Sequence, residues 1–436
     1  MHYDTIIVGG GAGGLELAAQ LGRKLGKTRG PEKILLIDRS VFHIWKPTLH
    51  EVAAGTLDAH QEGIGYPVLA RRNRFSFALG EMVALDLAGR TLTLGEIRDL
   101  DVGDAAVEGA GPSVLAPART LSFTRLVLAI GSGSNLFGTP GAEKAFVLER
   151  TEDAVRFHGR LLAAFTRASF SPSRALGVAI VGGGATGVEL SAELLEAHAA
   201  LEEGQGGEQR FRLDITLVEA ADRILGGLPE KISAQAQTAL ERKGVKVLTG
   251  TKVLEVRDGA LVTSAGEVPA ELIVWAAGIK AADSNAGLGL DVNRMNQFVV
   301  NGRLETAVDG VWAMGDCAAA PWKDGRTVPA RAQAAHQEAD YLAAAIRARM
   351  TERRVEADFR YKDFGSLVSL GENRGVGALM GGLGGPNFFI EGLVAKWVYM
   401  SLHLMHHAAI LGLTRTGVLA LARLLQQRVA GRLKLH

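Results

Sequence analysis

The sequence has very little cysteine, and its charges almost cancel. A single cysteine, Cys317, excludes an intrachain disulfide and any electron relay through a cysteine pair. The 48 basic and 47 acidic side chains leave a formal net charge of +1, which argues against nucleic acid as a partner. The N-terminus lacks the basic segment and apolar run of a secretory signal, so we expect the protein to stay in the compartment where it is made.

Glycine, by contrast, is abundant. The 55 glycines among 436 residues are about twice the usual share of roughly 7 %. They follow no collagen-like period, and many form short clusters beside apolar runs, as phosphate-binding turns do. A chain of this length is expected to form two or three domains.

Two segments of the chain repeat the same pattern. An apolar run at residues 5–8 precedes a glycine cluster and a helical pattern, and the same order recurs from residue 178. Each is typical of the start of a βαβ unit, in which a pyrophosphate approaches the N–H groups at a helix N-terminus so closely that side chains must be absent. The glycines with the required G-x-G-x-x-G spacing are Gly9, Gly11 and Gly14, and then Gly182, Gly184 and Gly187.

A carboxylate should follow each glycine turn at the end of the next strand, where it can bind ribose hydroxyls. Asp38 ends the apolar run of residues 33–37, and Glu219 ends that of residues 215–218. A carboxylate at position 219 would repel the 2′-phosphate of NADPH and favours NADH, although the nearby Arg223 leaves NADPH open. Two complete copies of the pattern make a chance match improbable.

The N-terminal site resembles the FAD site of the two-dinucleotide-binding flavoproteins, which have a glutathione-reductase-like fold. Residues 124–131 resemble the strand-to-glycine crossover of that superfamily, residues 272–278 its counterpart in the inserted domain, and residues 311–316 its second FAD motif, whose aspartate binds the ribityl chain. The resemblance implies one FAD and one nicotinamide site. Besides the residues given above, the expected nucleotide-binding residues are Ala12, Gly13, Arg39, Lys46, Pro47, Ala129, Gly131, Thr186, Ala277, Gly278, Gly315, Asp316 and Ala332.

Five segments make the resemblance more specific. Residues 45–55, which contain no cysteine, residues 182–194 and residues 329–337 are similar to type II NADH:quinone dehydrogenases, as are residues 361–370 and 432–436. This family implies non-covalent FAD, NADH as the donor, a membrane quinone as the acceptor, no proton pumping and a place on the cytoplasmic face of the bacterial inner membrane. Cys317, next to the second FAD motif, is more simply explained as a packed neighbour of the flavin than as a reactive thiol.

The resemblance also assigns roles to individual residues. Gln333 and Gln337 match the family's Ala-Gln-x-Ala-x-Gln quinone motif, on a helix that starts near Arg331. Glu189 matches the acidic residue that faces the contact between nicotinamide and flavin, and Lys46 with Pro47 matches the flavin-edge loop. As residues alone, Glu189 and Lys46 could equally be solvated groups, and two ordinary surface glutamines are the alternative at positions 333 and 337. Thr48 stands where the family often has leucine, so it predicts nothing about quinone fit.

The C-terminal part of the chain predicts contact with a membrane surface. Residues 397–414 contain no charged side chain but carry a stripe of histidines, His403, His406 and His407, which favours an amphipathic helix in the interface over a spanning one. Residues 418–429 repeat the arrangement. Residues 391–436 hold six basic side chains against one acid, which suits anionic headgroups. A dimer interface or a hairpin that covers a domain is the alternative, and the histidines have the spacing but not the partners of a metal site.

The sequence therefore predicts an α/β protein with two Rossmann-like dinucleotide-binding domains and a C-terminal amphipathic helical region that anchors it to the membrane. We expect a discontinuous FAD domain (1–150 and 283–355), an inserted NADH domain (151–282) and a membrane-associating region (356–436). Two other functions stay open: an NADH-dependent reductase of a small iron–sulfur protein, and a flavin- and NADH-binding redox sensor. The sequence also leaves open whether the chain forms a homodimer.

Overall fold

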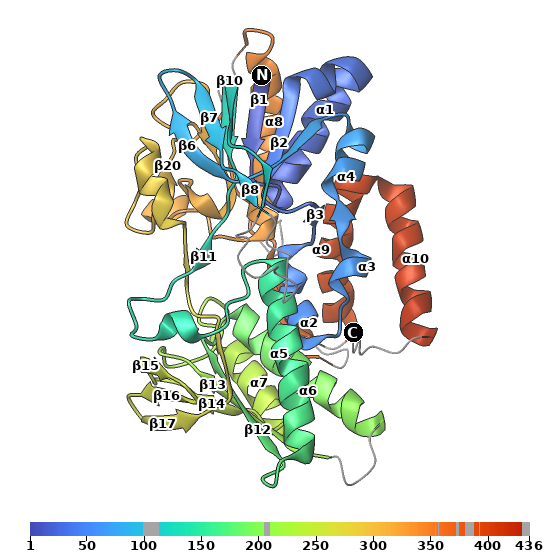
Figure 1. Ribbon diagram of the computed structural model, residues 1–436, viewed down its shortest axis with the longest axis vertical. Helices are drawn as coiled ribbons and strands as arrows, with labels where there is room; N and C mark the ends of the chain where they lie inside the picture. Colours follow the sequence, from blue (N-terminus) through green and yellow to red (C-terminus); the bar gives the residue numbers. More distant parts are fainter. Residues whose placement is uncertain are drawn as a thin grey trace.

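The computed structural model describes residues 1–98, 113–204, 210–353, 355, 357–371, 375–379, 388–391 and 393–429. Two α/β units lie one above the other along the long axis, and a C-terminal helical hairpin lies against their side (Figure 1). The first unit contains the N-terminal fingerprint and the second unit contains the repeat. The two units are thus built around the two segments that the sequence marked.

The first unit is built on a sheet in the order β5-β2-β1-β10-β7-β6, with β21 also paired to β10. β1, β2, β5, β10 and β21 pair in parallel, and β6 and β7 form an antiparallel edge. Fully buried side chains such as Ile6 and Ile7 show that β1 is covered on both faces. The strands are β1 (His2–Val8), β2 (Ile34–Asp38), β5 (Ser76–Leu79), β6 (Met82–Asp86), β7 (Thr91–Leu94), β10 (Arg119–Leu128) and β21 (Val311–Ala313).

The second unit has a four-stranded parallel sheet in the order β14-β13-β12-β18 and a three-stranded antiparallel sheet beside it. Because β21 joins the first sheet although it follows all seven of these strands, the chain returns to the first unit after forming the second. The strands are β12 (Ala175–Val181), β13 (Arg212–Val218), β14 (Lys246–Leu248), β15 (Val253–Arg257), β16 (Ala260–Thr263), β17 (Gly266–Pro269) and β18 (Leu272–Trp275).

Helices follow both glycine turns, as the sequence predicts. α1 (Ala12–Lys33) extends further than the expected end near residue 25, with a break at Gly26, whose φ of 89° interrupts the helical geometry. The polar residues 202–210 predict a surface insertion after the second helical pattern. α6 (Ala185–Gly204) nevertheless includes residues 202–204, and residues 205–209 lie outside the described residues. The other long helices are α5 (Thr151–Phe170), α7 (Glu230–Arg242) and α8 (Ala332–Arg349), the last starting after Arg331 as predicted.

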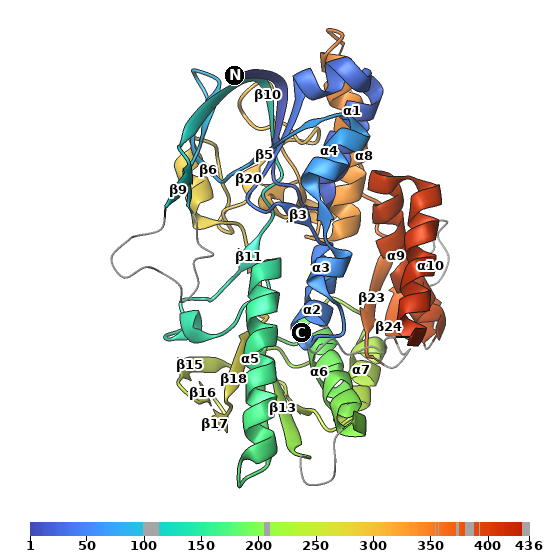
Figure 2. The ribbon, with the colours of Figure 1, turned by 45° about the vertical axis from the view of Figure 1, so that its right-hand side comes forward.

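Short elements connect these layers. Residues 99–117 are rich in Gly, Ala, Asp and Pro, which predicts a loop. Residues 99–112 lie outside the described residues, but residues 114–116 form a strand, β9, so the loop prediction is wrong there. Figure 2 shows α5 running along the second unit, with α2 and α3 between the units. The remaining main elements are β3 (Phe42–His43), β4 (Ile64–Gly65), β8 (Ile97–Arg98), β9 (Val114–Ala116), β11 (Gly133–Ser134), β19 (Ile279–Lys280), β20 (Phe298–Val299), β22 (Ala318–Ala319), α2 (Leu49–Ala54), α3 (Ala59–Glu62) and α4 (Tyr66–Asn73).

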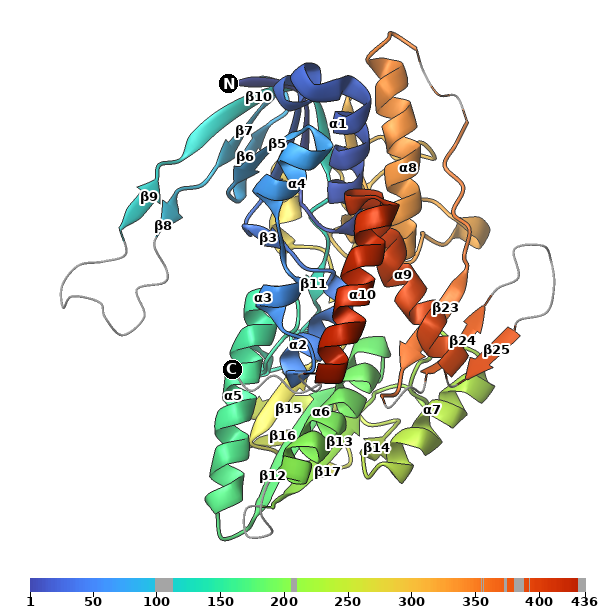
Figure 3. The same cartoon turned by 90° about the vertical axis from the view of Figure 1, so that its right-hand side faces the viewer.

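The C-terminal region begins with a small antiparallel sheet and ends in two helices. The sheet contains β23 (Gly365–Ser369), β24 (Gly375–Leu379) and β25 (Phe388–Glu391). α9 (Leu393–Leu411) and α10 (Leu413–Val429) then form a hairpin, with α9 next to the first unit (Figure 3). Among the described residues, no helix is both long enough and apolar enough to cross a bilayer.

Candidate active site

The two glycine turns have the same geometry. The first glycine of each turn has a positive φ, 105° at Gly9 and 109° at Gly182, which L side chains rarely adopt. A Cβ at Gly14 would lie 2.0 Å from the carbonyl oxygen of Gly9, and a Cβ at Gly187 would lie 2.0 Å from that of Gly182. The third glycine therefore permits the helix to start directly against the strand in both units.

The crossover segments pack behind the turns, and the second glycines face open space. A Cβ at Gly9 would lie 2.2 Å from the oxygen of Ala129, and one at Gly182 would lie 2.7 Å from Cα of Ala277. A Cβ at Gly11 or Gly184 would meet no described atom within 4 Å. Protein atoms fill the space around the first and third glycines and leave the second uncovered at the helix N-terminus, which fits a pyrophosphate at both turns.

The two predicted ribose carboxylates are also equivalent. Asp38 accepts hydrogen bonds from the N–H groups of Gly10 at 2.6 Å and Ser40 at 2.8 Å. Glu219 accepts them from the N–H groups of Gly183 at 2.6 Å and Ala221 at 2.7 Å. Each carboxylate thus lies at the edge of its turn. Burial raises the pKa of Asp38, although the N–H groups of Ser40 and Gly10 oppose the shift.

Two arginines near these carboxylates, Arg39 and Arg223, also entered the predictions for nucleotide binding. Arg39 lies 3.7 Å from the carboxylate of Glu81, on the surface. Arg223, which left NADPH open, donates to the carbonyl oxygens of Leu228 at 2.8 Å and Gly226 at 2.9 Å in its own loop.

The flavin-edge loop and the second FAD motif both form hydrogen bonds to Ser132. Lys46 donates to the carbonyl oxygen of Ser132 at 2.8 Å, and the hydroxyl of Ser132 donates to Asp316 at 2.9 Å. Gly131, at the end of the crossover segment, and Gly315, in the second FAD motif, have positive φ values of 72° and 69°. The structure thus brings Lys46, Gly131 and Asp316 together from three separate segments.

The second FAD motif also contacts an acid on α8 that was not predicted from the sequence. Glu338, on α8, is 1 % exposed and accepts a hydrogen bond from the N–H group of Gly315 at 2.5 Å. Burial raises its pKa to about 8. Beside Gln337 and Asp340, it gave no distinct signal in the sequence.

Cys317 is a buried neighbour of the same motif. Its side chain is fully buried, and its thiol lies 3.2 Å from the carbonyl oxygen of Met314. Burial raises the pKa of the thiol to about 12, so the thiolate, which is the reactive form, is scarce at neutral pH. These features fit the packed neighbour that the sequence favoured.

Glu189 is buried, which excludes its interpretation as a solvated glutamate. It is 6 % exposed, its Oε1 accepts from the N–H group of Ser369 on β23 at 3.0 Å, and its Oε2 lies 3.6 Å from Nδ1 of His50. Burial raises the pKa of Glu189 to about 8 and lowers that of His50 to about 4. At neutral pH the two groups are therefore mainly uncharged. His50 gave no distinct signal in the sequence.

Gln333 and Gln337 bind the backbone that leads into β23. Gln333 donates to the oxygen of Gly365 at 2.8 Å and accepts from the N–H group of Phe364 at 3.2 Å. Gln337 donates to the oxygen of Lys362 and accepts from its N–H group, both at 2.9 Å. Both side chains are half-buried, so neither is a free surface glutamine. In the structure they clamp this segment to the start of α8.

The histidine stripe of α9 faces the protein. His403, His406 and His407 are 7, 4 and 8 % exposed, whereas Met405 is 50 % exposed. α9 thus matches the alternative of a helix that covers a domain. Arg423, counted among the basic residues for headgroups, instead pairs with Glu51 at 3.7 Å and Glu62 at 3.4 Å, which lie outside the segment in which charges were counted. Arg432 and Lys434 lie outside the described residues.

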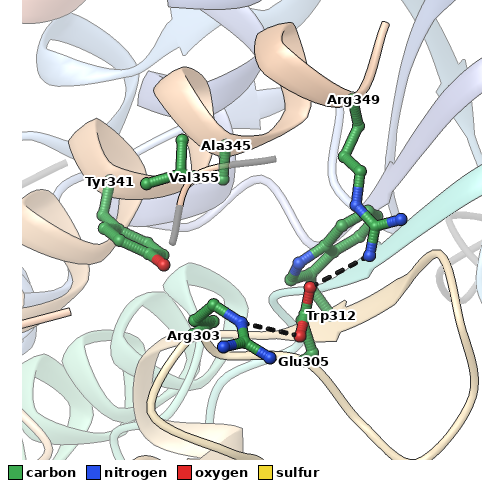
Figure 4. A pocket seen from close by; sticks show the side chains of 7 residues that line it. All are labelled: Arg303, Glu305, Trp312, Tyr341, Ala345, Arg349 and Val355. Atoms are coloured by element: carbon green, nitrogen blue, oxygen red, sulfur yellow. Dashed lines mark hydrogen bonds and ion pairs between the residues drawn. The ribbon is translucent and has the colours of Figure 1, made fainter. Parts of the chain in front are cut away.

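A separate cavity of about 360 Å³ lies between α8 and the segment that precedes β21 (Figure 4). Glu305 stands between Arg303 and Arg349 and accepts hydrogen bonds from both, each at 3.1 Å, so the cavity has no unpaired charge of its own among these residues. None of the predicted site residues lines it. Among the described residues there is also no group of three or more histidine, cysteine or acidic side chains that could hold a metal.

Comparison with known proteins agrees with this geometry. The family model of pyridine nucleotide-disulphide oxidoreductases matches residues 3–339. A type II NADH:quinone oxidoreductase of Haemophilus influenzae is 39 % identical over an alignment that covers 99 % of this chain and 100 % of that protein. The chain belongs to the type II NADH:quinone oxidoreductases. A second member, from Mycobacterium tuberculosis, is 27 % identical over 93 % of this chain and 84 % of its own length.

Solved structures show the fold of this type II NADH:quinone oxidoreductase. NDH2 from Plasmodium falciparum in complex with NADH superposes with a TM-score of 0.77 at 16 % identity, over 99 % of both chains. Putidaredoxin reductase, in its covalent complex with putidaredoxin, superposes with a TM-score of 0.64 at 21 % identity, over 86 % of this chain and 81 % of that chain. The expected α/β flavoprotein fold is therefore confirmed. The anchoring role of the C-terminal helices stays a prediction.

Proposed function

We propose that this chain transfers electrons from NADH through non-covalently bound FAD to a membrane quinone, without pumping protons. The observation that carries the proposal is the pair of equivalent turns, each with an open second glycine and a carboxylate at its edge, in a chain 39 % identical to a type II NADH:quinone oxidoreductase. The first turn would hold FAD, which accepts a hydride and returns the electrons to a quinone. The second turn would hold NADH.

The assignment of NADH to the second turn is supported by its charges. Glu219 offers a carboxylate where NADPH carries a phosphate, and the guanidinium of Arg223 is engaged by carbonyl oxygens of its own loop. Lys46, Ser132 and Asp316 would orient the first nucleotide beyond its pyrophosphate. The N-terminus of α8, which starts at Ala332, would stabilise negative charge at the flavin's N1–C2=O edge.

The direct test is anaerobic reduction of the yellow protein by NADH, followed by a soluble quinone. We expect the flavin absorbance to bleach with NADH and to return when the quinone is added. Bleaching without return on quinone would contradict the quinone assignment and favour an iron–sulfur partner. A protein that stays unreduced would contradict the proposal as a whole.

Glu189→Gln tests the role of the buried acid. Burial holds the pKa of Glu189 at about 8, so the carboxyl group is mostly protonated at pH 7 and ionises as the pH rises through 8. Glutamine imitates the protonated form and can keep the contact with the N–H group of Ser369. In stopped-flow measurements we expect bound flavin in the variant, slower flavin reduction or reoxidation, and loss of the rate change near pH 8. Glu271→Gln, which changes an exposed acid, is the control. Kinetics unchanged at every pH would remove Glu189 from the site.

Association with the membrane would use the outer face of α10. Leu413, Leu421 and Leu425, spaced along α10, are 82, 58 and 57 % exposed, which is a large amount of exposed apolar surface for one helix. Together with the exposed Arg415 they suit an anionic membrane surface on the cytoplasmic side. The quinone would enter from this side, between the hairpin and the segment leading into β23, which Gln333 and Gln337 bind.

Leu421→Asp tests this face. The substitution removes a leucine that is exposed in the protein and would be buried in the membrane, and it adds a charge. It should lower the partition coefficient on anionic phospholipid vesicles by at least about tenfold, because burying a leucine contributes roughly 1.5–3 kcal/mol. Cosedimentation with the vesicles measures the change. Val83→Asp, at a residue 60 % exposed on β6, is the matched control and should bind as the wild type does. Equal losses in both variants, or none in either, would contradict an α10 membrane surface.

A further inference from the structure

A hydrogen-bonded cluster joins α9 to the first glycine turn. Nε2 of His406, on α9, lies 2.8 Å from Nε2 of His43, and Nδ1 of His43 lies 3.1 Å from the carbonyl oxygen of Gly10. On its other side, Nδ1 of His406 lies 2.6 Å from the carboxylate of Glu16 on α1. Glu16 also lies 2.5 Å from Nδ1 of His336 on α8. Glu16, His43 and His406 are each at most 4 % exposed.

The number of protons in this cluster follows from its acceptors. The carbonyl of Gly10 can only accept, so Nδ1 of His43 must carry a proton. If His43 is neutral, its Nε2 is bare and must accept a proton from Nε2 of His406. The contact between the two Nε2 atoms thus holds one proton. If both imidazoles were charged, two N–H groups and two positive charges would face each other at 2.8 Å.

His403 is subject to the same restriction. Its Nε2 lies 3.2 Å from the guanidinium of Arg423, which has only donors, so this nitrogen must be bare. Protonation of His403 would place two cations in contact. His407 donates from Nδ1 to the oxygen of His403 at 3.0 Å and is buried as well. His43 and His403 are therefore held in states that an additional proton would disrupt.

We propose that this histidine face is a pH-sensitive latch, which holds α9 on the FAD-binding turn while one proton lies between His43 and His406 and releases it when both are charged. The latch reaches the turn directly, because the oxygen of Gly10 also accepts from the hydroxyl of Tyr66 at 2.7 Å, and its N–H group binds Asp38. Movement of α9 would therefore change the hydrogen bonds of the Gly10 peptide. The inference concerns the hairpin and does not require quinone turnover.

The direction of the pH dependence follows from burial. Burial lowers the pKa of His43 well below 6.5, that of His407 to about 4 and that of His403 to about 2. In an open hairpin these values return toward 6.5, so the open form takes up protons that the docked form refuses. Docking therefore weakens as the pH falls below 6.5, about tenfold per pH unit for each of these three histidines that becomes exposed.

The other charged groups around α9 do not reverse this direction. Burial would raise the pKa of Glu16, but its hydrogen bonds to His336 and His406 outweigh burial and lower it. Protonation of Glu16 in acid would weaken its contact with His406, which acts in the same direction. His336, whose pKa Glu16 raises, contacts Glu16 and Asp340, neither of which is on α9. Arg23 and Asn73 donate to the carbonyl oxygens of Ala409 and Ile410 at 2.8 and 3.0 Å and do not titrate in this range. Among the described residues, further facing charges are Glu51 and Glu62, paired with Arg423, and Arg72 beside the exposed Arg415.

Hydrogen exchange of the full-length yellow protein, read by mass spectrometry, tests the latch. Protection factors for amides 403–411 are compared with those of α8 in the same sample, which removes the intrinsic effect of pH on exchange. Between pH 7.5 and 5.5 we expect the protection of α9 to fall at least about tenfold while that of α8 holds. Constant protection of α9 across this range would overturn the proposal.

His43→Gln separates the latch from general acid instability. Glutamine can still donate to the oxygen of Gly10 and accept from His406, but it does not titrate. The variant should retain more of the α9 protection at pH 5.5, by up to about tenfold relative to the wild type. His2→Gln, at an exposed histidine on β1, is the control and should behave as the wild type does. The same loss in His43→Gln as in wild type would overturn the role of His43, and a colourless His43→Gln leaves the wild-type measurement as the deciding one.

Discussion

Gly14→Ala should yield a protein without flavin, whereas Gly187→Ala should stay yellow and lose its reaction with NADH. Each substitution places a Cβ 2.0 Å from the carbonyl oxygen of the first glycine in its own turn. This oxygen belongs to the backbone and cannot move away without shifting the strand or the helix, so the N–H groups that would bind the pyrophosphate lose their arrangement. We expect affinity for the respective nucleotide to fall at least about 100-fold, equivalent to about 2.7 kcal/mol. Flavin absorbance and anaerobic titration with NADH measure the two effects.

The two variants control for each other because the local clash is the same in both. A third variant, Gly184→Ala, adds a methyl group where no described atom lies within 4 Å, so it should leave the fold intact and weaken NADH alone. Gly159→Ala, at an equally open glycine on α5, should change neither nucleotide. If Gly187→Ala removed the flavin and Gly14→Ala kept it, the assignment of the two turns would be reversed.

The parts of this site that could be predicted from sequence are those with local requirements. A glycine turn, its strand and its helix lie within about 30 consecutive residues, and the reason for each glycine is the approach of one backbone atom to another nearby. The position of α8 was predicted for a similar reason, because Arg331 and the glutamine pair lie in one short segment. These features can be recognised without knowing which distant segments pack together.

What could not be predicted depends on partners that are far apart in the chain. Glu16 appeared as one acid in the first helix, and only folding brings it to His406, 390 positions later. Arg423 was counted toward a membrane surface because Glu51 and Glu62 lie in another part of the chain. The glutamines at 333 and 337 suggested substrate binding, and the structure gives their amides to the backbone before β23. A charge count or a helical spacing contains no information about such contacts.

Glu16→Ala should lower the free energy of unfolding by about 3–5 kcal/mol, because it removes one member of a buried charged network and leaves its partners unpaired. Glu16 is 1 % exposed and binds both His336 on α8 and His406 on α9. Denaturation by urea, followed by circular dichroism at pH 7, measures the loss. Asp340→Ala is the matched control: its carboxylate lies 3.8 Å from the same His336 but is 57 % exposed, so a change of at most about 1 kcal/mol is expected.

The pH dependence distinguishes this loss from removal of a packed side chain. The hydrogen bonds from the two histidines lower the pKa of Glu16 below 4.5. Its stabilising contribution is therefore complete above pH 4.5 and is lost as the pH falls toward the pKa that Glu16 has in the folded protein. The difference between wild type and Glu16→Ala should therefore narrow in acid. A cavity left by deleted methylene groups would cost the same at every pH. A loss that does not change with pH would show that Glu16 contributes by packing alone, and a loss below about 1 kcal/mol at pH 7 would show that its histidine contacts are not stabilising.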